Sequence, residues 1–229
     1  LSKYNFKHAY FTKSSSEKFL KLLGNNFNEN SINCVSNQIH SNILTFGSHS
    51  QEGSKTNADG LVGNKCNQNL WVYTADCMPI FFADKRTRKV AALHCGRKGL
   101  EKKIIKSLVR IFDNLGTSRD DLLVAIGPAI SKKYYLVDQK TLKEFYRKTE
   151  NLTKTEKDFF IDDLNHLKKK NLNQLDLKRF AYSQLLNENI HSTNIDISNL
   201  CTYELKNEFN SWRRNKTISR QWNFISSER

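Results

Sequence analysis

The chain has 229 residues, of which 38% are hydrophobic, and no apolar run approaches the roughly 20 residues needed to cross a bilayer. Its formal net charge is +14, but the lysines and arginines occur in short groups spread along the chain, without interleaved aromatic residues. This composition excludes a membrane-spanning protein, and it favours a solvated basic surface over a nucleic-acid-binding surface.

The N-terminal residues and the cysteines bear on the cellular compartment. The stretch LSKYNFKHAYFTKSSS has no apolar segment followed by the small-residue cleavage site that a secretory signal requires. The five cysteines are odd in number and show no CxxC spacing, so we expect free thiols in a reducing compartment. The sequence therefore predicts a cytoplasmic protein, and it does not indicate an oligomeric state.

Most of the first hundred residues favour β-structure. Apolar residues at helical spacing after a polar start predict one helix, over residues 16–27. Short β-branched or aromatic runs, bounded by Asn, Gly and Asp, predict strands over residues 32–40, 43–46, 70–74, 79–83 and 90–94. The N-terminal part of the chain is therefore expected to supply most of the sheet.

The rest of the chain alternates helices and strands. Apolar residues recur at helical spacing over residues 100–115 and stop at Gly116, which predicts a helix with a C-terminal glycine. A continuous apolar strand over residues 122–126 leads into the turn Gly127-Pro128. We further expect helices over residues 139–149 and 175–188, strands over 195–203 and 221–225, and a polar connection over 149–158. This alternation predicts a mixed α/β layered domain.

Three side chains that commonly bind metals stand at or near the ends of predicted strands. Cys77 follows Asp76 and precedes Pro79 by two positions, which places it at a strand edge or in a loop. His94 ends the run VAALH, and His40 ends the run CVSNQIH. Two imidazoles and a thiolate are good zinc ligands, and three protein ligands leave open the fourth position that a catalytic zinc site requires.

The same residues allow two other interpretations. A buried cysteine is usually a small hydrophobic residue and a single histidine usually a structural one, so spacing alone does not establish a metal site. Alternatively, Cys77 acts as a thiolate nucleophile with His94 as its base, which would make a cysteine hydrolase or amidase. The remaining histidines have polar neighbours in the sequence and are predicted to lie at the surface: His8, His49, His166 and His191.

Short motifs follow one another in a fixed order along nearly the whole chain. They are Gln38-Ile39-His40, Ala75-Asp76-Cys77-Met78-Pro79, His94-Cys95-Gly96-Arg97-Lys98-Gly99, Gly127-Pro128-Ala129-Ile130, Cys201-Thr202-Tyr203, Trp212-Arg213-Arg214 and Ser219-Arg220. In this order and spacing the chain resembles the YfiH-like laccase-domain family. Members of that family are described as polyphenol oxidases and as purine nucleoside phosphorylases with adenosine deaminase activity.

The resemblance implies a fold, a metal and its ligands. It implies a single compact layered α/β domain over residues 1–229, with mixed β-sheets flanked by helices. The family's zinc ligands correspond by position to His40, Cys77 and His94. Copper is the less favoured metal, because multicopper oxidation needs more histidines than the six of this chain supply. The family's fold is also grouped with toxin-type cysteine deamidases, which leaves the cysteine hydrolase open.

The resemblance also implies a reaction. It is phosphorolysis of adenosine, inosine or guanosine, with methylthioadenosine as a further candidate, to a purine base and ribose 1-phosphate. Adenosine deamination would use water activated by zinc. Asp76 and Lys98 are candidate catalytic residues, although an aspartate placed like Asp76 often only binds backbone amides. Lys98, Arg214 and Arg220 are candidate phosphate contacts, whereas Cys201 is predicted to be a core residue.

The chain departs from the family pattern beside the predicted site. The family's HAGWRG is HCGRKG here, so Cys95 replaces a small residue, Arg97 a tryptophan, and Lys98 an arginine with its bidentate fork. Ala129 and Ser219 stand where a cysteine and a glycine are common, and FTKSSSEKF replaces a longer loop. A third hypothesis is therefore a non-catalytic nucleoside-binding relative that keeps zinc and turns over no nucleoside.

Overall fold

Three β-sheets organise the part of the chain that the structure describes. The computed structural model describes residues 1–15, 31–51, 54–149, 161–162 and 172–227. The strands are β1 (His8–Tyr10), β2 (Ile32–Val35), β3 (Leu44–Phe46), β4 (Gly60–Val62), β5 (Gln68–Thr74), β6 (Met78–Asp84), β7 (Val90–Cys95), β8 (Leu122–Ile126), β9 (Leu136–Asp138), β10 (Ile161–Asp162), β11 (Leu172–Leu175), β12 (Ile195–Ile197) and β13 (Gln221–Ser227). The helices are α2 (Arg97–Glu101), α3 (Ile104–Asn114), α4 (Gln139–Lys148), α7 (Leu177–Asn187) and α8 (Trp212–Asn215).

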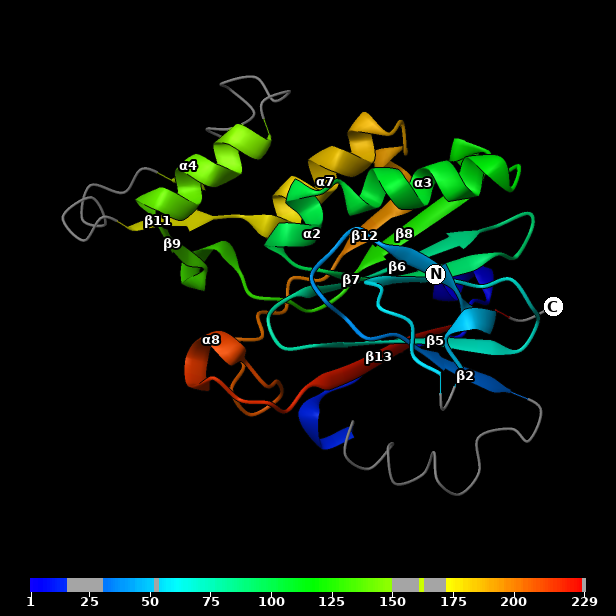
Figure 1. Ribbon diagram of the computed structural model, residues 1–229, viewed down its shortest axis with the longest axis horizontal. Coiled ribbons are helices and arrows are strands. Elements are labelled where there is room, and N and C mark those ends of the chain that lie inside the picture. The colour runs from blue at the N-terminus through cyan, green and yellow to red at the C-terminus, as the bar shows by residue number, and fades with distance from the viewer. Residues whose placement is uncertain (16–30, 52–53, 150–160, 163–171, 228–229) are drawn as a thin grey trace.

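The two larger sheets and the helices form stacked layers (Figure 1). The six-stranded sheet has the order β12-β8-β6-β7-β4-β3 and contains both parallel and antiparallel neighbours. Helices α2, α3 and α7 cover one of its faces, and the four-stranded sheet, of order β1-β13-β5-β2, covers the other. These layers confirm the predicted class, a compact layered α/β domain with mixed sheets. Its extent over residues 1–229 stays a prediction.

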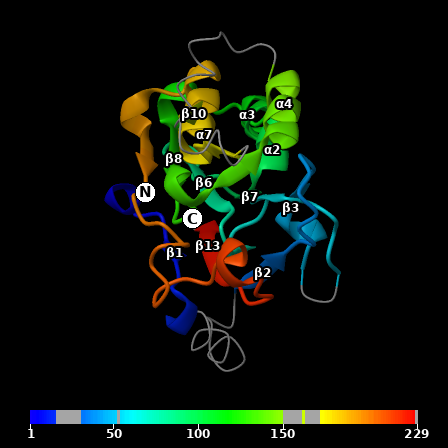
Figure 2. The same ribbon diagram turned by 90° about the vertical axis from the view of Figure 1, so that its left-hand side faces the viewer.

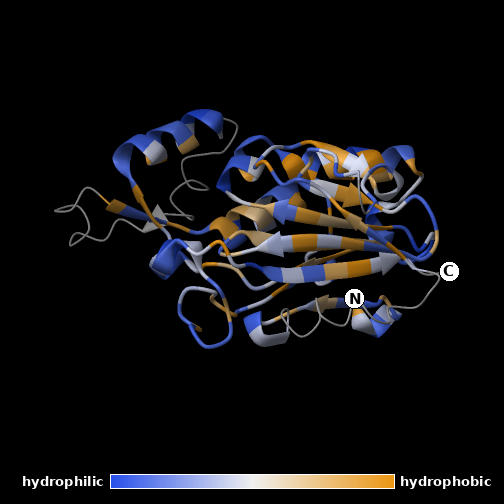
Figure 3. Ribbon diagram, turned by 60° about the horizontal axis from the view of Figure 1, so that its bottom comes forward, coloured by the Kyte–Doolittle hydropathy of each residue, from blue (hydrophilic) through white to orange (hydrophobic). Residues whose placement is uncertain are grey.

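Strand β6 shows why the central strands are apolar at nearly every position. Ile80 and Phe82 pack into the core on the helical side, whereas Phe81 and Ala83 pack into the core between the two sheets. Successive side chains of a strand point to opposite faces, so a strand between two layers needs apolar residues throughout. Figure 3 shows orange segments within the sheets, mixed with white and blue ones.

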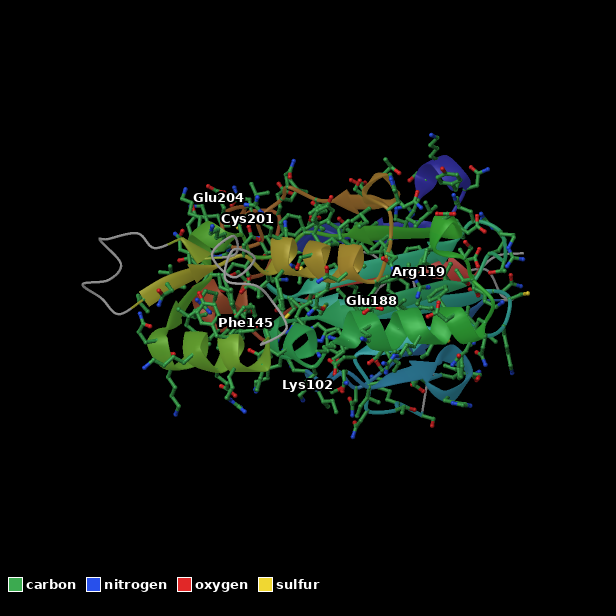
Figure 4. All side chains as sticks on the ribbon, turned by 90° about the horizontal axis from the view of Figure 1, so that it is seen from above. Lys102, Arg119, Phe145, Glu188, Cys201 and Glu204 are labelled. Atoms are coloured by element: carbon green, nitrogen blue, oxygen red, sulfur yellow. The ribbon has the colours of Figure 1, made fainter. Side chains whose placement is uncertain are left out.

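A three-stranded sheet of order β10-β11-β9 and helix α4 extend from one end of the layers (Figure 1). Phe145 of α4, which Figure 4 labels, meets Phe180 of α7 edge-on, with 4.8 Å between ring centroids. Both side chains are buried. Since edge-on aromatic pairs add a favourable contact to the burial of both rings, this pair joins α4 to the helical layer.

The antiparallel pair β6 and β7 brings two of the predicted site residues to one edge. Strand β6 begins directly after Cys77, and β7 ends with His94 and Cys95. The register pairs Pro79 with His94, because the start of one antiparallel strand lies beside the end of its neighbour. Helices α2 and α8 lie at this same end of the sheets, which Figure 2 views from that side.

The helix predicted over residues 100–115 is divided into α2 and α3. Lys103 has a φ of 61°, in the left-handed region, and separates the two helices. The side chain of Asn42 donates a hydrogen bond to the carbonyl oxygen of Lys102 at 3.0 Å, and so occupies an acceptor at the end of α2. The periodicity did not reveal this break, because apolar residues on both sides of it are buried in one core.

The remaining predictions differ from the structure mainly at short strands. The strand predicted over residues 32–40 ends at Val35, and that over 195–203 ends at Ile197. Five strands of two to four residues were not predicted, because a pattern of alternation cannot be recognised over so few positions. They are β1, β4, β9, β10 and β11. The helix over residues 16–27 and most of the connection over 149–158 lie outside the described residues. No helix in the described ranges is long and apolar enough to cross a membrane.

Asp84 closes the turn between β6 and β7 with a buried carboxylate. Its Oδ1 accepts hydrogen bonds from the backbone N–H groups of Arg86 and Thr87 at 2.8 and 2.9 Å. Its Oδ2 accepts from the hydroxyls of Thr87 and Thr117, both at 2.6 Å. Burial acts to raise the pKa of Asp84, but these hydrogen bonds outweigh it and hold the pKa below its ordinary value.

We expect Asp84→Asn to lower the free energy of unfolding by about 2–4 kcal/mol, because the new amide nitrogen would face the hydroxyls of Thr87 and Thr117 and could not accept their hydrogen bonds. Since the folded-state pKa is lowered, the wild-type advantage is present above the unfolded pKa of about 4 and is lost as the pH falls through the folded value. Urea unfolding at neutral pH and in acid measures both effects.

Asp121→Asn is the matched control, because the Asp121 carboxylate is partly exposed and forms ion pairs with Lys85 and Arg86 at 4.0 and 3.6 Å. It should change the free energy of unfolding by less than about 1 kcal/mol. Equal losses in the two variants, or an Asp84→Asn effect that does not shrink in acid, would contradict the role given to Asp84.

Candidate functional site

The three predicted ligand residues lie together at the end of the sheets. One donor atom from each of His40, Cys77 and His94 lies within 4.8 Å of the other two. Sγ of Cys77 is 3.8 Å from Nε2 of His40. In a tetrahedral zinc site, bonds of about 2.0 and 2.3 Å separate nitrogen from sulfur by about 3.5 Å. The donor set and its spacing therefore fit a small metal ion.

Gly96 leaves the space that this convergence needs. It lies between β7 and α2, and a Cβ atom built on it would stand 2.7 Å from Sγ of Cys77 and 3.4 Å from the ring of His40. Any side chain there would displace the thiol, because real Cβ atoms do not approach sulfur so closely. The first glycine of HCGRKG is thus required by close packing.

Gln38 fixes the loop that carries His40. Its side-chain Nε2 donates to the carbonyl oxygen of Tyr73 at 2.7 Å, and its Oε1 accepts from the N–H of Tyr73 at 2.9 Å. The side-chain amide thus pairs with β5 as a strand backbone would. This pairing holds His40, whose φ of 56° is left-handed, beside the sheet although β2 has already ended at Val35.

Asp59, which the sequence analysis missed, connects two of the candidate ligands. Its buried Oδ1 lies 2.8 Å from Nδ1 of His94. The same carboxylate accepts hydrogen bonds from the backbone N–H groups of Ile39, His40 and Ser41, and from the Ser41 hydroxyl. Because Nδ1 of His94 is engaged in this way, Nε2 is the nitrogen left for a ligand.

The charged groups of the site stabilise one another. Burial acts to raise the pKa of Cys77, but the charge of His94 and the hydrogen bonds of His40 and His94 outweigh it and lower the pKa to about 6. Burial acts to lower the pKa of His94, but the Cys77 thiolate and Asp59 outweigh it and raise the pKa to about 9. The thiolate thus favoured is the form of cysteine that binds metals and acts as a nucleophile.

Asp76 holds the C-terminal segment against the site. Its buried carboxylate accepts hydrogen bonds from the hydroxyls of Thr202 and Ser211 at 2.7 and 3.0 Å, and from the backbone N–H of Arg213 at 2.7 Å. These donors belong to the CTY and WRR motifs or immediately precede them. These hydrogen bonds to backbone and hydroxyl donors match the structural alternative that the sequence left open for Asp76. A part for Asp76 in proton transfer stays a prediction.

A cavity of about 620 Å³ opens over the three candidate ligands. Its walls include Tyr135 and Trp212, and Trp212 is 47% exposed. Nζ of Lys216 lies over one face of the Trp212 ring, 3.5 Å from its centroid. Four cationic side chains also line the cavity: Arg97, Lys98, Arg213 and Arg220. Asp76 is the one carboxylate among the described lining residues. The size and charge therefore suit a small ligand with an anionic group.

The structure separates the basic residues that the sequence nominated. Lys98 is exposed at the cavity, and Arg220 lines it while its guanidinium donates to carbonyl oxygens of its own loop. Arg214 is not brought to the cavity, because its guanidinium donates to three backbone carbonyl oxygens, those of Thr202, Tyr203 and Phe209. Arg97 and Arg213, for which the sequence predicted no role, line the cavity instead.

Other single-residue predictions have mixed outcomes. Cys201 is buried, which confirms its assignment to the core. His49 and His191 are exposed as predicted, and His166 lies outside the described residues. The surface prediction for His8 was wrong: its ring is half-buried and packs edge-on against Phe81, because the short strand β1 lies at the sheet edge over the core.

The sequence matches the family described as multi-copper polyphenol oxidoreductase laccase over residues 14–228. A Synechocystis protein named purine nucleoside phosphorylase is 31% identical over 180 residues, which cover 74% of this chain and 68% of that protein. A Rickettsia conorii protein of the same name is 30% identical over 227 residues, which cover 96% of this chain and 88% of that protein.

Solved structures share the fold. YfiH from Bacillus licheniformis superposes with a TM-score of 0.78 at 25% identity and covers 94% of this chain and 80% of its own. A Neisseria meningitidis protein superposes with a TM-score of 0.76 at 22% identity, covering 93% of this chain and 79% of its own. These findings confirm the resemblance read from the motifs, and the chain belongs to the multi-copper polyphenol oxidoreductase laccase family.

Proposed function

We propose that this protein is a zinc-dependent purine nucleoside phosphorylase that also deaminates adenosine. The observation that carries the proposal is the convergence of His40, Cys77 and His94 beneath a cavity of nucleoside size lined by cationic side chains. The relatives named purine nucleoside phosphorylase supply the reaction class. The proposed substrates are purine nucleosides and inorganic phosphate.

The donor set supports zinc as the metal. Two imidazoles and one thiolate from His40, His94 and Cys77 form a three-ligand set, which leaves one position for substrate or water. Bound zinc would stabilise developing negative charge and lower the pKa of water. Copper is disfavoured as an oxidation centre, because in the described ranges this is the one group of three or more histidine, cysteine or acidic side chains arranged to bind a metal.

The chain's own residues provide what phosphorolysis needs. Phosphate attacks C1′ of the ribose while the bond to the purine breaks, so negative charge moves onto the base and must be stabilised there. Lys216 lies over one face of the Trp212 ring, so we expect a purine to stack on the other face. Cationic side chains that line the same cavity attract phosphate. Burial raises the pKa of Tyr135, so its hydroxyl stays protonated at neutral pH and can donate a hydrogen bond.

A second candidate function is a metal-free cysteine hydrolase. Cys77, His94 and Asp59 form a nucleophile, base and orienting carboxylate, and the Cys77 pKa of about 6 favours the thiolate. Iodoacetamide would inactivate such an enzyme, and strong chelators would leave it active. The zinc enzyme shows the opposite response to chelators.

We expect Cys77→Ala to carry less than about one fifth of the zinc of the wild-type protein, because loss of a thiolate leaves only two ligands. Elemental analysis after gel filtration measures the zinc content. Cys66→Ala is the control, since Cys66 is an exposed free cysteine outside the ligand group, and it should retain the wild-type zinc content. Equal zinc in all three proteins would remove the metal assignment.

We expect Asp59→Asn to weaken zinc binding by about 10- to 100-fold, because it loses the carboxylate that orients His94 and holds the His40 loop. Competition with a chromogenic chelator measures the affinity. Asp138→Asn is the control, because the Asp138 side chain only caps α4 by accepting from Thr141. An affinity for zinc unchanged by Asp59→Asn would show that the ligands need no such support.

We expect the pure protein to convert adenosine to adenine only when phosphate is present, and to convert adenosine to inosine with or without phosphate. Chromatography of the products with and without phosphate separates the two reactions. If the zinc-loaded protein converts none of the four nucleosides, the non-catalytic nucleoside-binding relative is favoured instead. The four are adenosine, inosine, guanosine and methylthioadenosine.

A further inference from the structure

We propose that Arg97, positioned by the buried carboxylate of Glu101, is the principal phosphate-binding residue of the cavity. The inference rests on the proposed function for the identity of the anion, but it assigns a specific side chain to it. Arg97 stands one helical turn before Glu101 in α2, directly after the close contact of Gly96 with Cys77. Arg97 therefore lies at the wall of the cavity next to the candidate ligands.

Glu101 is an unusual residue for its location. Its side chain is only 1% exposed, and Oε1 pairs with Nη1 of Arg97 while Oε2 lies 3.4 Å from Nζ of Lys148. A buried carboxylate is strongly unfavourable unless a cation compensates it, so Glu101 restricts the guanidinium of Arg97 to one location. Lys148 is shared with the exposed Glu144, so it compensates Glu101 only in part.

Arg97, Tyr135 and Arg213 line the same cavity. The guanidinium of Arg213 lies over the Tyr135 ring, 4.8 Å from its centroid. Arg213 is fixed in turn by Asp76, which accepts its backbone N–H, and by the carbonyl oxygen of Leu136 at 2.6 Å. Two planar cations from distant segments thus face one cavity.

This arrangement matches the chemistry of a phosphate group. A guanidinium has five N–H donors, and Glu101 accepts from only one nitrogen of the Arg97 guanidinium, Nη1. The remaining donors can form the paired hydrogen bonds that phosphate oxygens accept from arginine. The one carboxylate among the described lining residues, Asp76, is occupied by three protein donors and does not compete for Arg97.

Titration calorimetry of the purified full chain with inorganic phosphate tests the proposal without requiring turnover. Arg97→Gln should raise the phosphate Kd by at least about tenfold, because it removes a charge-assisted pair of hydrogen bonds. Arg97→Lys, which keeps the charge next to Glu101 but loses the fork, should raise the Kd by about three- to tenfold. Wild-type affinity in Arg97→Gln, or no phosphate binding by the wild type, overturns the proposal.

Glu101→Gln tests the positioning role, and Glu144→Gln is its matched control. Both variants remove a carboxylate partner of Lys148, but only Glu101 also holds Arg97. Glu101→Gln should raise the phosphate Kd by at least about threefold. Glu101→Asp keeps a carboxylate, so its Kd should lie between those of Glu101→Gln and the wild type. The Kd of Glu144→Gln should stay within about twofold of the wild-type value. Equal Kd values for Glu101→Gln and Glu144→Gln overturn the positioning role. Should Glu101→Gln not fold, as judged by circular dichroism, Arg97→Lys decides the proposal.

Failure of this inference is distinguishable from failure of the proposed function. Arg97-dependent phosphate binding without cleavage of any nucleoside supports the inference and rejects phosphorolysis. If Arg97→Gln still cleaves adenosine in a phosphate-dependent reaction with an unchanged KM for phosphate, phosphorolysis is supported and the role of Arg97 is rejected. Phosphate would then bind in another part of the cavity.

Discussion

The carboxylate of Asp59 is the constraint on which the geometry of the candidate site depends. One oxygen orients the ring of His94 at the end of β7, and the two oxygens together accept the backbone N–H groups of residues 39–41. A single buried anion therefore sets both the rotation of one imidazole and the path of the loop that carries the other. Without this carboxylate the buried N–H of Ser41 would be left unpaired, at a cost of about 1–3 kcal/mol. Ligand geometry and local folding are thus coupled through one side chain.

The layered fold explains why the reactive groups gather at one edge. The middle sheet is covered on both faces, so the central strands have no surface at which a polar side chain meets solvent. Polar groups can therefore reach a ligand only where strands begin or end. The β6–β7 pairing puts Cys77 and His94 at the same edge, and Gly96 allows the chain to turn into α2 without a side chain that would displace the thiol. The site is a consequence of strand direction and close packing together.

The sequence predicted the parts of this arrangement that depend on local pattern. His40, Cys77 and His94 stood out because their chemistry is unusual at strand ends, and the ordered motifs indicated which of them belong together. Asp59 gave no comparable signal: it is one of 23 acidic residues, and only the folded chain shows which one reaches His94. Arg214 and Arg213 are adjacent in the sequence, yet the first binds backbone carbonyl groups and the second faces the cavity. That choice depends on the direction of each side chain in α8, which periodicity over so short a helix does not determine.

The proposal for Arg97 gives the altered HCGRKG segment a role as an anion site. An isolated buried carboxylate destabilises the fold, so the buried Glu101 requires a cation such as Arg97 beside it. Arg97 and Glu101 occur one helical turn apart in α2, where their side chains are 16% and 1% exposed, and Lys148 pairs with the same carboxylate. If Arg97 binds phosphate as proposed, a guanidinium at position 97 supplies the planar fork that lysine at position 98 lacks. Compared with the family's HAGWRG, the arginine then stands one position earlier, at 97 instead of 98. The glycine that accommodates the thiol, Gly96, is the same in both.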